Sequence, residues 1–299
     1  MNKITPFLWF DNQAEEAMNF YVSVFSNSEV HEVNRYGEGA PQPEGTAMTT
    51  SFRLAGQEFA ALNGGPVFNF TPAVSFFVDC ETEEEIDALW SQLVEGGSVL
   101  MPFDKYPFSD KYGWLNDRYG VSWQVMLSGE PQSITPFLTF VGDQNGHAEE
   151  AINFSTSLFA NSRVEQINRY GPGLGEPEDA VVHARFTLAS QPFIAMESSL
   201  EHVFSFTEAT SFSVRCESQE EVDDLWEKLT DGGEPGQCAW LKDKYGLSWQ
   251  IVPTALMEML QDEDPEKSSR VMQAMLKMTK IDIAELRRAY DQPSVAATT

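Results

Sequence analysis

Residues 118–124 read Arg-Tyr-Gly-Val-Ser-Trp-Gln, and residues 244–250 repeat the motif as Lys-Tyr-Gly-Leu-Ser-Trp-Gln. Each copy follows a Trp-Leu-x-Asp segment and is typical of a glycine-containing turn that leads into a short strand. Side chains alternate across a strand, so Gln124 and Gln250 should point away from the neighbouring tryptophans. A buried amide needs hydrogen-bond partners, and we therefore expect the glutamine face of each strand to look onto a polar or hydrated space.

These two motifs close the two halves of a tandem repeat. Three further motifs recur with a spacing of roughly 130 residues. They are Ile-Thr-Pro-Phe-Leu at 4–8 and 134–138, Ala-Glu-Glu-Ala at 14–17 and 148–151, and Asn-Arg-Tyr-Gly at 34–37 and 168–171. A period this long indicates duplication of a whole domain, with a polar seam rich in Gly and Pro at 128–133. We therefore predict two domains, 1–128 and 133–253.

The hydrophobic pattern of each repeat predicts a strand, a helix and three strands, followed by the same unit again. In the first repeat, helices are expected at Ala14–Phe25 and at Glu83–Val94, the second ended by a Gly-Gly pair. Strands are expected at Thr5–Phe10, Val30–Arg35, Thr46–Leu54, Glu58–Leu62, Ala73–Val78, Val99–Met101, Gly113–Asn116 and Val121–Leu127. The second repeat follows the same order from Thr135 to Val252, without a counterpart of Pro102–Asp110.

A helical extension is predicted after the second repeat, over 254–291. Helices are expected at Thr254–Leu260, Asp264–Lys277 and Ile281–Tyr290, with Pro265 at a helix start. An apolar stripe on the second of these helices is interpreted as a docking surface, with a ligand grip as the alternative. Its members are Val271, Met272, Met275 and Leu276. The end of the chain, Gln292–Thr299, is expected to be frayed.

Composition and charge narrow the classes of partner. The 299 residues include 46 acidic and 19 basic side chains, a formal net charge of −27. Binding to nucleic acid and to anionic membranes relies on clustered Lys and Arg, so both partners are disfavoured. No apolar run approaches the roughly 20 residues that a membrane helix needs, and residues 1–6 lack the features of a secretory signal. We therefore expect a cytoplasmic protein. Its three cysteines (Cys80, Cys216 and Cys238) form neither a disulfide framework nor a zinc ribbon.

The motifs that open and close each repeat resemble, as a set, those of the vicinal oxygen chelate superfamily, which includes glyoxalase and the bleomycin-resistance proteins. Within it the chain looks like the PhnB-like group, often labelled 3-demethylubiquinone-9 3-methyltransferase-like, and segments 264–267, 270–275 and 280–284 also look like that group. The resemblance implies an α+β fold of two tandem glyoxalase-like domains, each with two βαβββ modules that form a curved mixed sheet around a cavity. The domains would form a pseudo-dimer within one chain, and a homodimer of the whole chain stays open.

The resemblance also bears on metal binding. In the metal-using members, ligands come from the first strand, from the strand that opens the second module and from the last strand. Carried over by motif, these positions are Pro6 or Pro136, Ala73 or Ala209, and Gln124 or Gln250. Proline and alanine side chains cannot coordinate, and a single glutamine is a weak neutral ligand. We therefore expect no metal ligand among the site residues and no cofactor.

Other polar residues are candidates for the site. His183 lies in a predicted strand where the first repeat has Thr49, and it is a candidate general base. Glu197 ends a strand where the first repeat has Asn63, and it is the candidate carboxylate partner. Two arginines end strands before glycine turns, where they could clamp an anion or pair with acids of the rim. The expected ligand-binding set is Gln124, Gln250, Arg35, Arg169, Thr49 and Asn63.

Together these observations predict a metal-free protein that binds a small molecule, with a cavity per half. The alternative is a glyoxalase-like lyase or isomerase acting through His183, Glu197 and Gln250, so whether the chain is an enzyme stays open. A methyltransferase-like transferase, as the group label suggests, is disfavoured because the sequence has no Gly-rich G-x-G-x-x-G loop between a strand and a helix.

Overall fold

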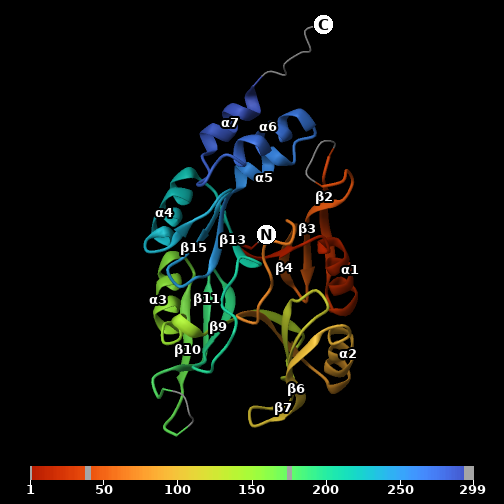
Figure 1. The fold of residues 1–299 in the computed structure, drawn as a ribbon, viewed down its shortest axis with the longest axis vertical. Helices are drawn as coiled ribbons and strands as arrows, with labels where there is room; N and C mark the ends of the chain where they lie inside the picture. The colour runs from red at the N-terminus through yellow and green to blue at the C-terminus, as the bar shows by residue number, and fades with distance from the viewer. Residues whose placement is uncertain (1, 38–41, 174–176, 293–299) are drawn as a thin grey trace. The chain divides into compact units, whose positions relative to one another are not determined.

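The computed structural model describes residues 2–37, 42–173 and 177–292 (Figure 1). The chain forms two compact units. The first comprises Thr5–Ser211, and the second comprises Asn2–Ile4 together with Phe212–Thr299. The segment expected to be frayed lies, from residue 293 onward, outside the described residues.

The first repeat contains the predicted order of elements. They are β1 (Ile4–Phe10), α1 (Ala14–Val24), β2 (Glu29–Arg35), β3 (Ala47–Leu54), β4 (Gln57–Asn63), β5 (Val74–Cys80), α2 (Glu83–Leu93), β6 (Ser98–Tyr106), β7 (Ser109–Asn116) and β8 (Ser122–Leu127). The strands β6 and β7 are longer than the pattern predicted. Most of the Pro102–Asp110 segment is a continuation of these two paired strands, because Asp104 pairs with Tyr112 and Tyr106 with Ser109 across the hairpin.

The second repeat and the extension complete the chain. The elements are β9 (Ser133–Phe140), a 3-10 helix (Gly142–Gln144), α3 (Ala148–Leu158), β10 (Arg163–Arg169), β11 (Val181–Leu188), β12 (Gln191–Glu197), β13 (Thr210–Cys216), α4 (Gln219–Thr230), β14 (Glu234–Pro235), β15 (Trp240–Lys242), β16 (Ser248–Pro253), α5 (Thr254–Leu260), α6 (Pro265–Met275) and α7 (Ile283–Asp291). The three C-terminal helices occur where the sequence predicted them.

The strands form two mixed sheets of eight strands each, in the orders β14-β15-β16-β13-β1-β4-β3-β2 and β10-β11-β12-β9-β5-β8-β7-β6. The predicted α+β fold of two glyoxalase-like domains with C-terminal helices is confirmed. The structure adds that each sheet takes one βαβββ module from each repeat. All strands of the second sheet lie in the first unit, and we call it the shared sheet.

The two repeats contact each other within the first unit, and several of these contacts join equivalent residues. The central pair β5 and β9 is antiparallel, with Ser75 opposite Phe137. Gln191 Nε2 donates to Gln57 Oε1 at 2.5 Å. The loop hydroxyls of Thr71 and Thr207 donate to main-chain oxygens of the other repeat, at 2.6 and 2.8 Å. The two repeats therefore form a pseudo-dimer within one chain.

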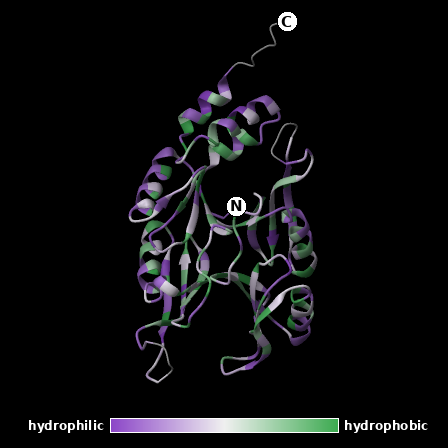
Figure 2. Ribbon diagram, viewed as in Figure 1, coloured by the Kyte–Doolittle hydropathy of each residue, from purple (hydrophilic) through white to green (hydrophobic). Residues whose placement is uncertain are grey.

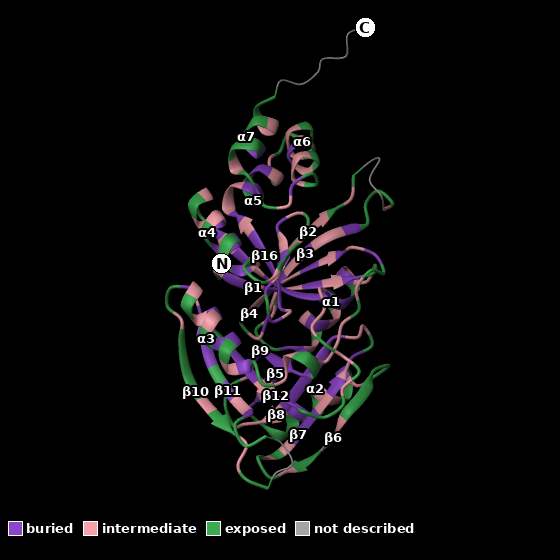
Figure 3. Ribbon diagram, turned by 60° about the vertical axis from the view of Figure 1, so that its left-hand side comes forward, coloured by how far each residue is buried: buried purple, intermediate pink, exposed green. Residues whose placement is uncertain are grey.

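One face of the shared sheet packs against helices. Helix α2 contacts β5, β7 and β8, and α3 contacts β10, β11 and β12. Thr82 caps α2, because its hydroxyl accepts from the Glu85 N–H at 3.2 Å. The side chains of Ile86, Leu89 and Leu93 enter a core that contains the fully buried Trp123. Figure 3 shows the central strands of the sheet as largely buried ribbons.

The C-terminal helices form an apolar cluster with residues of the second unit. Asp264 caps α6, Pro265 occupies its first turn and Val271 of the predicted apolar stripe is fully buried, whereas Leu276 of that stripe is 51% exposed. The backbone N–H of Cys238 donates to Met278 O at 2.8 Å and that of Ala239 to Thr279 O at 3.0 Å. Figure 2 shows hydrophilic and apolar residues alternating along these helices, which is typical of helices that bury one side only. None of the helices in the described part of the chain is long and apolar enough to cross a membrane.

Candidate functional site

The candidate ligand surface is the face of the shared sheet that is turned away from α2 and α3, which we call the open face. It carries an apolar cluster built on Phe77, Tyr112, Phe137 and Ile194. Partly buried side chains extend it: Met101, Tyr106, Trp114, Met126 and Met196. These residues come from β5, β6, β7, β8, β9 and β12, so both repeats contribute. A largely apolar surface with a few fixed polar groups is typical of small-molecule sites.

Gln124 supplies the polar group at the centre of the open face. Its side chain is 3% exposed. The Tyr112 hydroxyl donates to Gln124 Oε1 at 2.7 Å, and Gln124 Nε2 donates to Ser75 Oγ at 2.8 Å. Burial raises the pKa of Tyr112, which keeps its hydroxyl a donor. The orientation of the amide is therefore fixed by both partners, and one N–H of the amide is left for another acceptor.

His183 lies on the open face, beside the cationic Arg185. Its neighbour Ala184 is fully buried opposite Ala195, so His183 and Arg185 point to the other side of β11. Burial, and next the nearby Arg185, lower the pKa of His183. The imidazole is therefore neutral at pH 7 and can accept or donate a hydrogen bond. The structure thus places His183 and Gln124 on one face of one sheet.

Glu197 lies on the opposite face of the shared sheet from His183. It is 2% exposed, and its carboxylate accepts from the Ala148 N–H at 2.7 Å and from the Val181 N–H at 2.6 Å. Asn63 has the same place in the first repeat, where it accepts from the Ala14 N–H at 2.8 Å and donates to Ala47 O. Both side chains hold the start of a helix against a strand, and the structure does not bring Glu197 and His183 together.

The two arginines of the Asn-Arg-Tyr-Gly motif pair with acids of neighbouring helices. Arg35 donates to both carboxylate oxygens of Glu15, at 3.0 and 2.6 Å, and these hydrogen bonds lower the pKa of Glu15. Arg169 donates to Glu149 at 2.5 Å and to Asp179 O. Thr49 accepts from Asn34 Nδ2 at 3.3 Å on the other sheet. These residues tie strands to helices and to each other.

The aspartate before each closing motif organises the turn. Asp117 accepts from the N–H groups of Tyr119 and Val121 and, at 2.8 Å, from Trp123 Nε1. Asp243 repeats all three contacts in the second unit. Burial raises the pKa of Asp243 to about 6. Gln250 in β16 is the counterpart of Gln124. It is 6% exposed and lies opposite Trp240 of β15.

The residues of the open face do not fit a metal site of the superfamily's kind. The described residues contain no group of three His, Cys, Asp or Glu side chains that could hold a metal ion. Pro136 pairs with the fully buried Phe76, on the face covered by α2. The amide of Gln124 is engaged with Ser75 and Tyr112. One neutral oxygen ligand does not hold Zn²⁺ or Fe²⁺.

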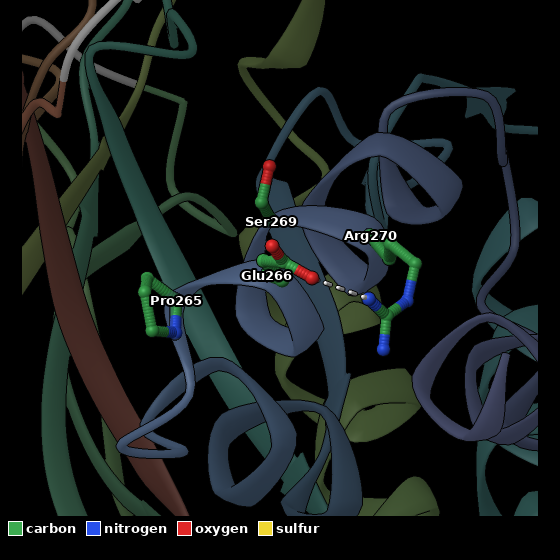
Figure 4. A pocket seen from close by; sticks show the side chains of 4 residues that line it. All are labelled: Pro265, Glu266, Ser269 and Arg270. Atoms are coloured by element: carbon green, nitrogen blue, oxygen red, sulfur yellow. Dashed lines mark ion pairs between the residues drawn. The ribbon is translucent and has the colours of Figure 1, made fainter. Parts of the chain in front are cut away.

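A hollow on α6 in the second unit is lined by Pro265, Glu266, Ser269 and Arg270 (Figure 4). Arg270 forms a 4.0 Å ion pair with Glu266 within the helix. Its guanidinium also donates to Ala289 O and Tyr290 O, at 3.0 and 3.1 Å. The guanidinium of Arg270 therefore joins α6 to α7. We interpret the hollow as a result of helix packing and not as a ligand site.

The family of the chain is shown by its sequence. The sequence model of the 3-demethylubiquinone-9 3-methyltransferase family matches twice, at residues 2–126 and 132–252. The chain is 53% identical to a PhnB protein from Bacillus cereus, over 42% of this chain and 100% of that one, with a TM-score of 0.41. A Staphylococcus aureus protein is 35% identical over 42% of this chain and 97% of its own, with a TM-score of 0.19.

Glyoxalase I from Zea mays has the same fold at low identity. It is 8% identical, with a TM-score of 0.54 over 84% of this chain and 92% of its own. A search of proteins with curated descriptions found no match.

Proposed function

The chain belongs to the PhnB-like 3-demethylubiquinone-9 3-methyltransferase family of the vicinal oxygen chelate superfamily, and from that premise we propose that it binds a small, partly aromatic molecule on the open face. The binding uses apolar contacts and one fixed amide, and it does not depend on a metal. The observation that carries this proposal is the Gln124 side chain, held by Tyr112 and Ser75 within an apolar cluster.

The Gln124 amide is held within an apolar cluster at an energetic cost that its partners offset. Burying an amide in apolar surroundings is unfavourable unless its polar atoms are paired. Here two partners fix the amide and leave one N–H for a ligand oxygen, while Phe77 and Phe137 supply apolar area. Such a surface recognises a flat, mostly apolar molecule with an acceptor at one position.

Proton transfer by His183 is the second candidate, of the glyoxalase-like lyase or isomerase type. It is favoured by the position of His183 on the open face and by the direction of its pKa shift, since a neutral imidazole can take a proton at pH 7. Methyl transfer is not part of the proposal. The connections that lead from β1 to α1 and from β5 to α2, residues 11–13 and 81–82, contain no glycine to approach a cofactor phosphate.

The test is mass spectrometry of small molecules that co-purify with the protein, combined with elemental analysis. In Met196→Glu a charge replaces a partly buried thioether on the open face, and we expect the co-purified species to be lost. Leu200→Glu is the matched control, because Leu200 is 67% exposed in a loop. Retention of the species by Met196→Glu, or zinc or iron at one equivalent in dialysed wild-type protein, would contradict the proposal.

A further inference from the structure

Arg185 stands apart from the other arginines of the first unit. Five of them pair with a glutamate: Arg35, Arg53, Arg118, Arg163 and Arg169. The side chain of Arg185 takes part in none of the ion pairs or hydrogen bonds found among the described residues. In a chain with 46 acidic side chains, a cation on a sheet face without a carboxylate partner points to an anion supplied from outside.

The strand register sets Arg185 beside the apolar cluster. Arg185 lies opposite Ile194, and Ile194 lies opposite Phe137 on the next strand. Both apolar side chains are at most 5% exposed. Met196, on the same face of β12 as Ile194, is partly buried, and adjacent strands are about 5 Å apart, so an aromatic ring resting on Met196 brings a substituent within reach of the guanidinium.

Two buried hydroxyls on the same face have no protein partner. Thr187 Oγ1 is on the strand and face of Arg185, and Thr139 Oγ1 is on the strand and face of Phe137. Neither oxygen has a hydrogen-bond partner among the described residues, although Thr139 is 2% exposed and Thr187 7%. Buried polar atoms are normally satisfied, so unpaired hydroxyls on the sheet face that carries an unpaired cation indicate places for ligand oxygens.

We propose that Arg185 anchors the anionic group of the ligand, an aromatic carboxylate or sulfonate whose ring system rests on Met196 over the apolar cluster. This inference rests on the proposed function and adds the chemical class of the ligand. A planar guanidinium binds such a group through two parallel hydrogen bonds, and the neutral His183 beside it can add a third.

The first repeat does not carry this anchor. Asn168 pairs with His183 and Gln166 with Arg185, whereas Asn34 pairs with Thr49 and Glu32 with Ser51. Thr49 and Ser51 therefore stand at the positions of His183 and Arg185. The next arginine along the first repeat, Arg53, is paired with Glu29 at 2.7 Å. The anion site is thus specific to the β10–β12 half of the shared sheet.

The experiment compares two fluorescent probes of similar shape that differ in charge. The anionic probe is 8-anilinonaphthalene-1-sulfonate, and the neutral probe is N-phenyl-1-naphthylamine. We expect both to bind the wild-type protein and Met196→Glu to weaken both. Arg185→Met should weaken the sulfonate about tenfold and change the neutral probe less than about twofold, while Arg185→Lys should restore part of the loss. Arg163→Met is the control for charge alone, since Arg163 pairs with Glu165.

The outcomes separate the two proposals. If both probes bind and are weakened by Met196→Glu, but Arg185→Met leaves the sulfonate unchanged or Arg163→Met weakens it equally, the anion anchor is wrong and the proposed function stands. If neither probe binds the wild type, or if Met196→Glu affects neither, the proposed function fails and the anchor fails with it.

Discussion

The indole N–H of Trp249 donates a hydrogen bond to the carboxylate of Asp243 at 2.9 Å, and the same pair recurs in the first repeat as Trp123 and Asp117. The carboxylate also accepts two backbone N–H groups of the Tyr-Gly turn. One aspartate therefore fixes the turn and the first part of the strand that carries the glutamine. The conformation of the closing motif depends on a residue that precedes it.

Asp243 should make unfolding pH-dependent in an unusual direction. Its folded pKa of about 6 lies above the ordinary aspartate value, so the folded state binds this proton more tightly than the unfolded state. The contribution of this group to the free energy of unfolding therefore falls as pH rises from about 4 to about 6, by up to about 3 kcal/mol. Asp243→Asn removes this titration, so the melting temperature of the variant relative to that of the wild type should be higher at pH 7 than at pH 4.5.

Thermal unfolding of both proteins between pH 4.5 and 7.5 measures this difference. The other carboxyl groups are common to both proteins, so the difference between the two curves reports Asp243. A constant difference across this range would show that the carboxyl is not protonated in the folded state. Glu263→Gln, which changes an exposed acid, serves as the control.

Tyr21 should stabilise the first closing motif. Its hydroxyl donates to Asp117 Oδ2 at 2.6 Å and is fully buried. Tyr21→Phe removes a donor from a buried carboxylate, and we expect a loss of about 1–3 kcal/mol in the free energy of unfolding. The hydroxyl of Tyr119 contacts the exposed Glu16 at 3.1 Å. Tyr119→Phe should therefore lower the free energy of unfolding by less than about 1 kcal/mol.

Chemical denaturation of the two variants gives the comparison. A double-mutant cycle of Tyr21→Phe with Asp117→Asn isolates the interaction of the two side chains. Additive losses in this cycle would mean that the hydroxyl and the carboxylate are not coupled.

Substitutions at Glu197 and at His183 should affect different properties, the first stability and the second probe binding. Glu197→Ala leaves the N–H groups of Ala148 and Val181 without an acceptor and should lower the free energy of unfolding by about 1–3 kcal/mol. Probe binding at the open face should stay within about twofold, because Glu197 lies on the other side of the sheet. His183→Ala should show the reverse pattern. Equal loss of probe binding in both variants, at unchanged stability, would argue that the two residues act together.

This pair also shows where sequence reasoning reaches its limit. The alternation of side chains correctly separated Gln124 from Trp123 within one strand. Relating His183 to Glu197 requires the register of β11 and β12, which is set by the turn at Ala189 and Ser190, with φ of 48° and 69°. Such left-handed turn positions are usually filled by Asn or Gly, so Ala189 and Ser190 do not identify the hairpin in the sequence.

The repeats in the sequence predicted the fold of each domain, but they did not predict that each sheet combines strands of both repeats. Nothing local predicts that β5 pairs with β9 of the other repeat, because that pairing depends on packing between modules. Tyr112 was missed for a related reason. Its strand was expected to begin at Gly113, and only the paired hairpin of β6 and β7 brings its hydroxyl to Gln124.

Gln124→Glu should not create a metal site. The substitution places an acid where metal-using relatives carry one, but the neighbouring side chains are Ser75, Phe77 and Tyr112, which do not complete a set of three strong ligands. We expect less than about 0.1 equivalent of zinc or iron after incubation and dialysis, measured by elemental analysis, because a lone carboxylate binds these ions weakly. The variant should still weaken binding of the neutral probe, because it places a negative charge among the apolar side chains of the open face. Gln92→Glu on the exposed side of α2 is the control for the added charge. One bound equivalent in Gln124→Glu but not in Gln92→Glu would show that the open face retains a metal-binding geometry.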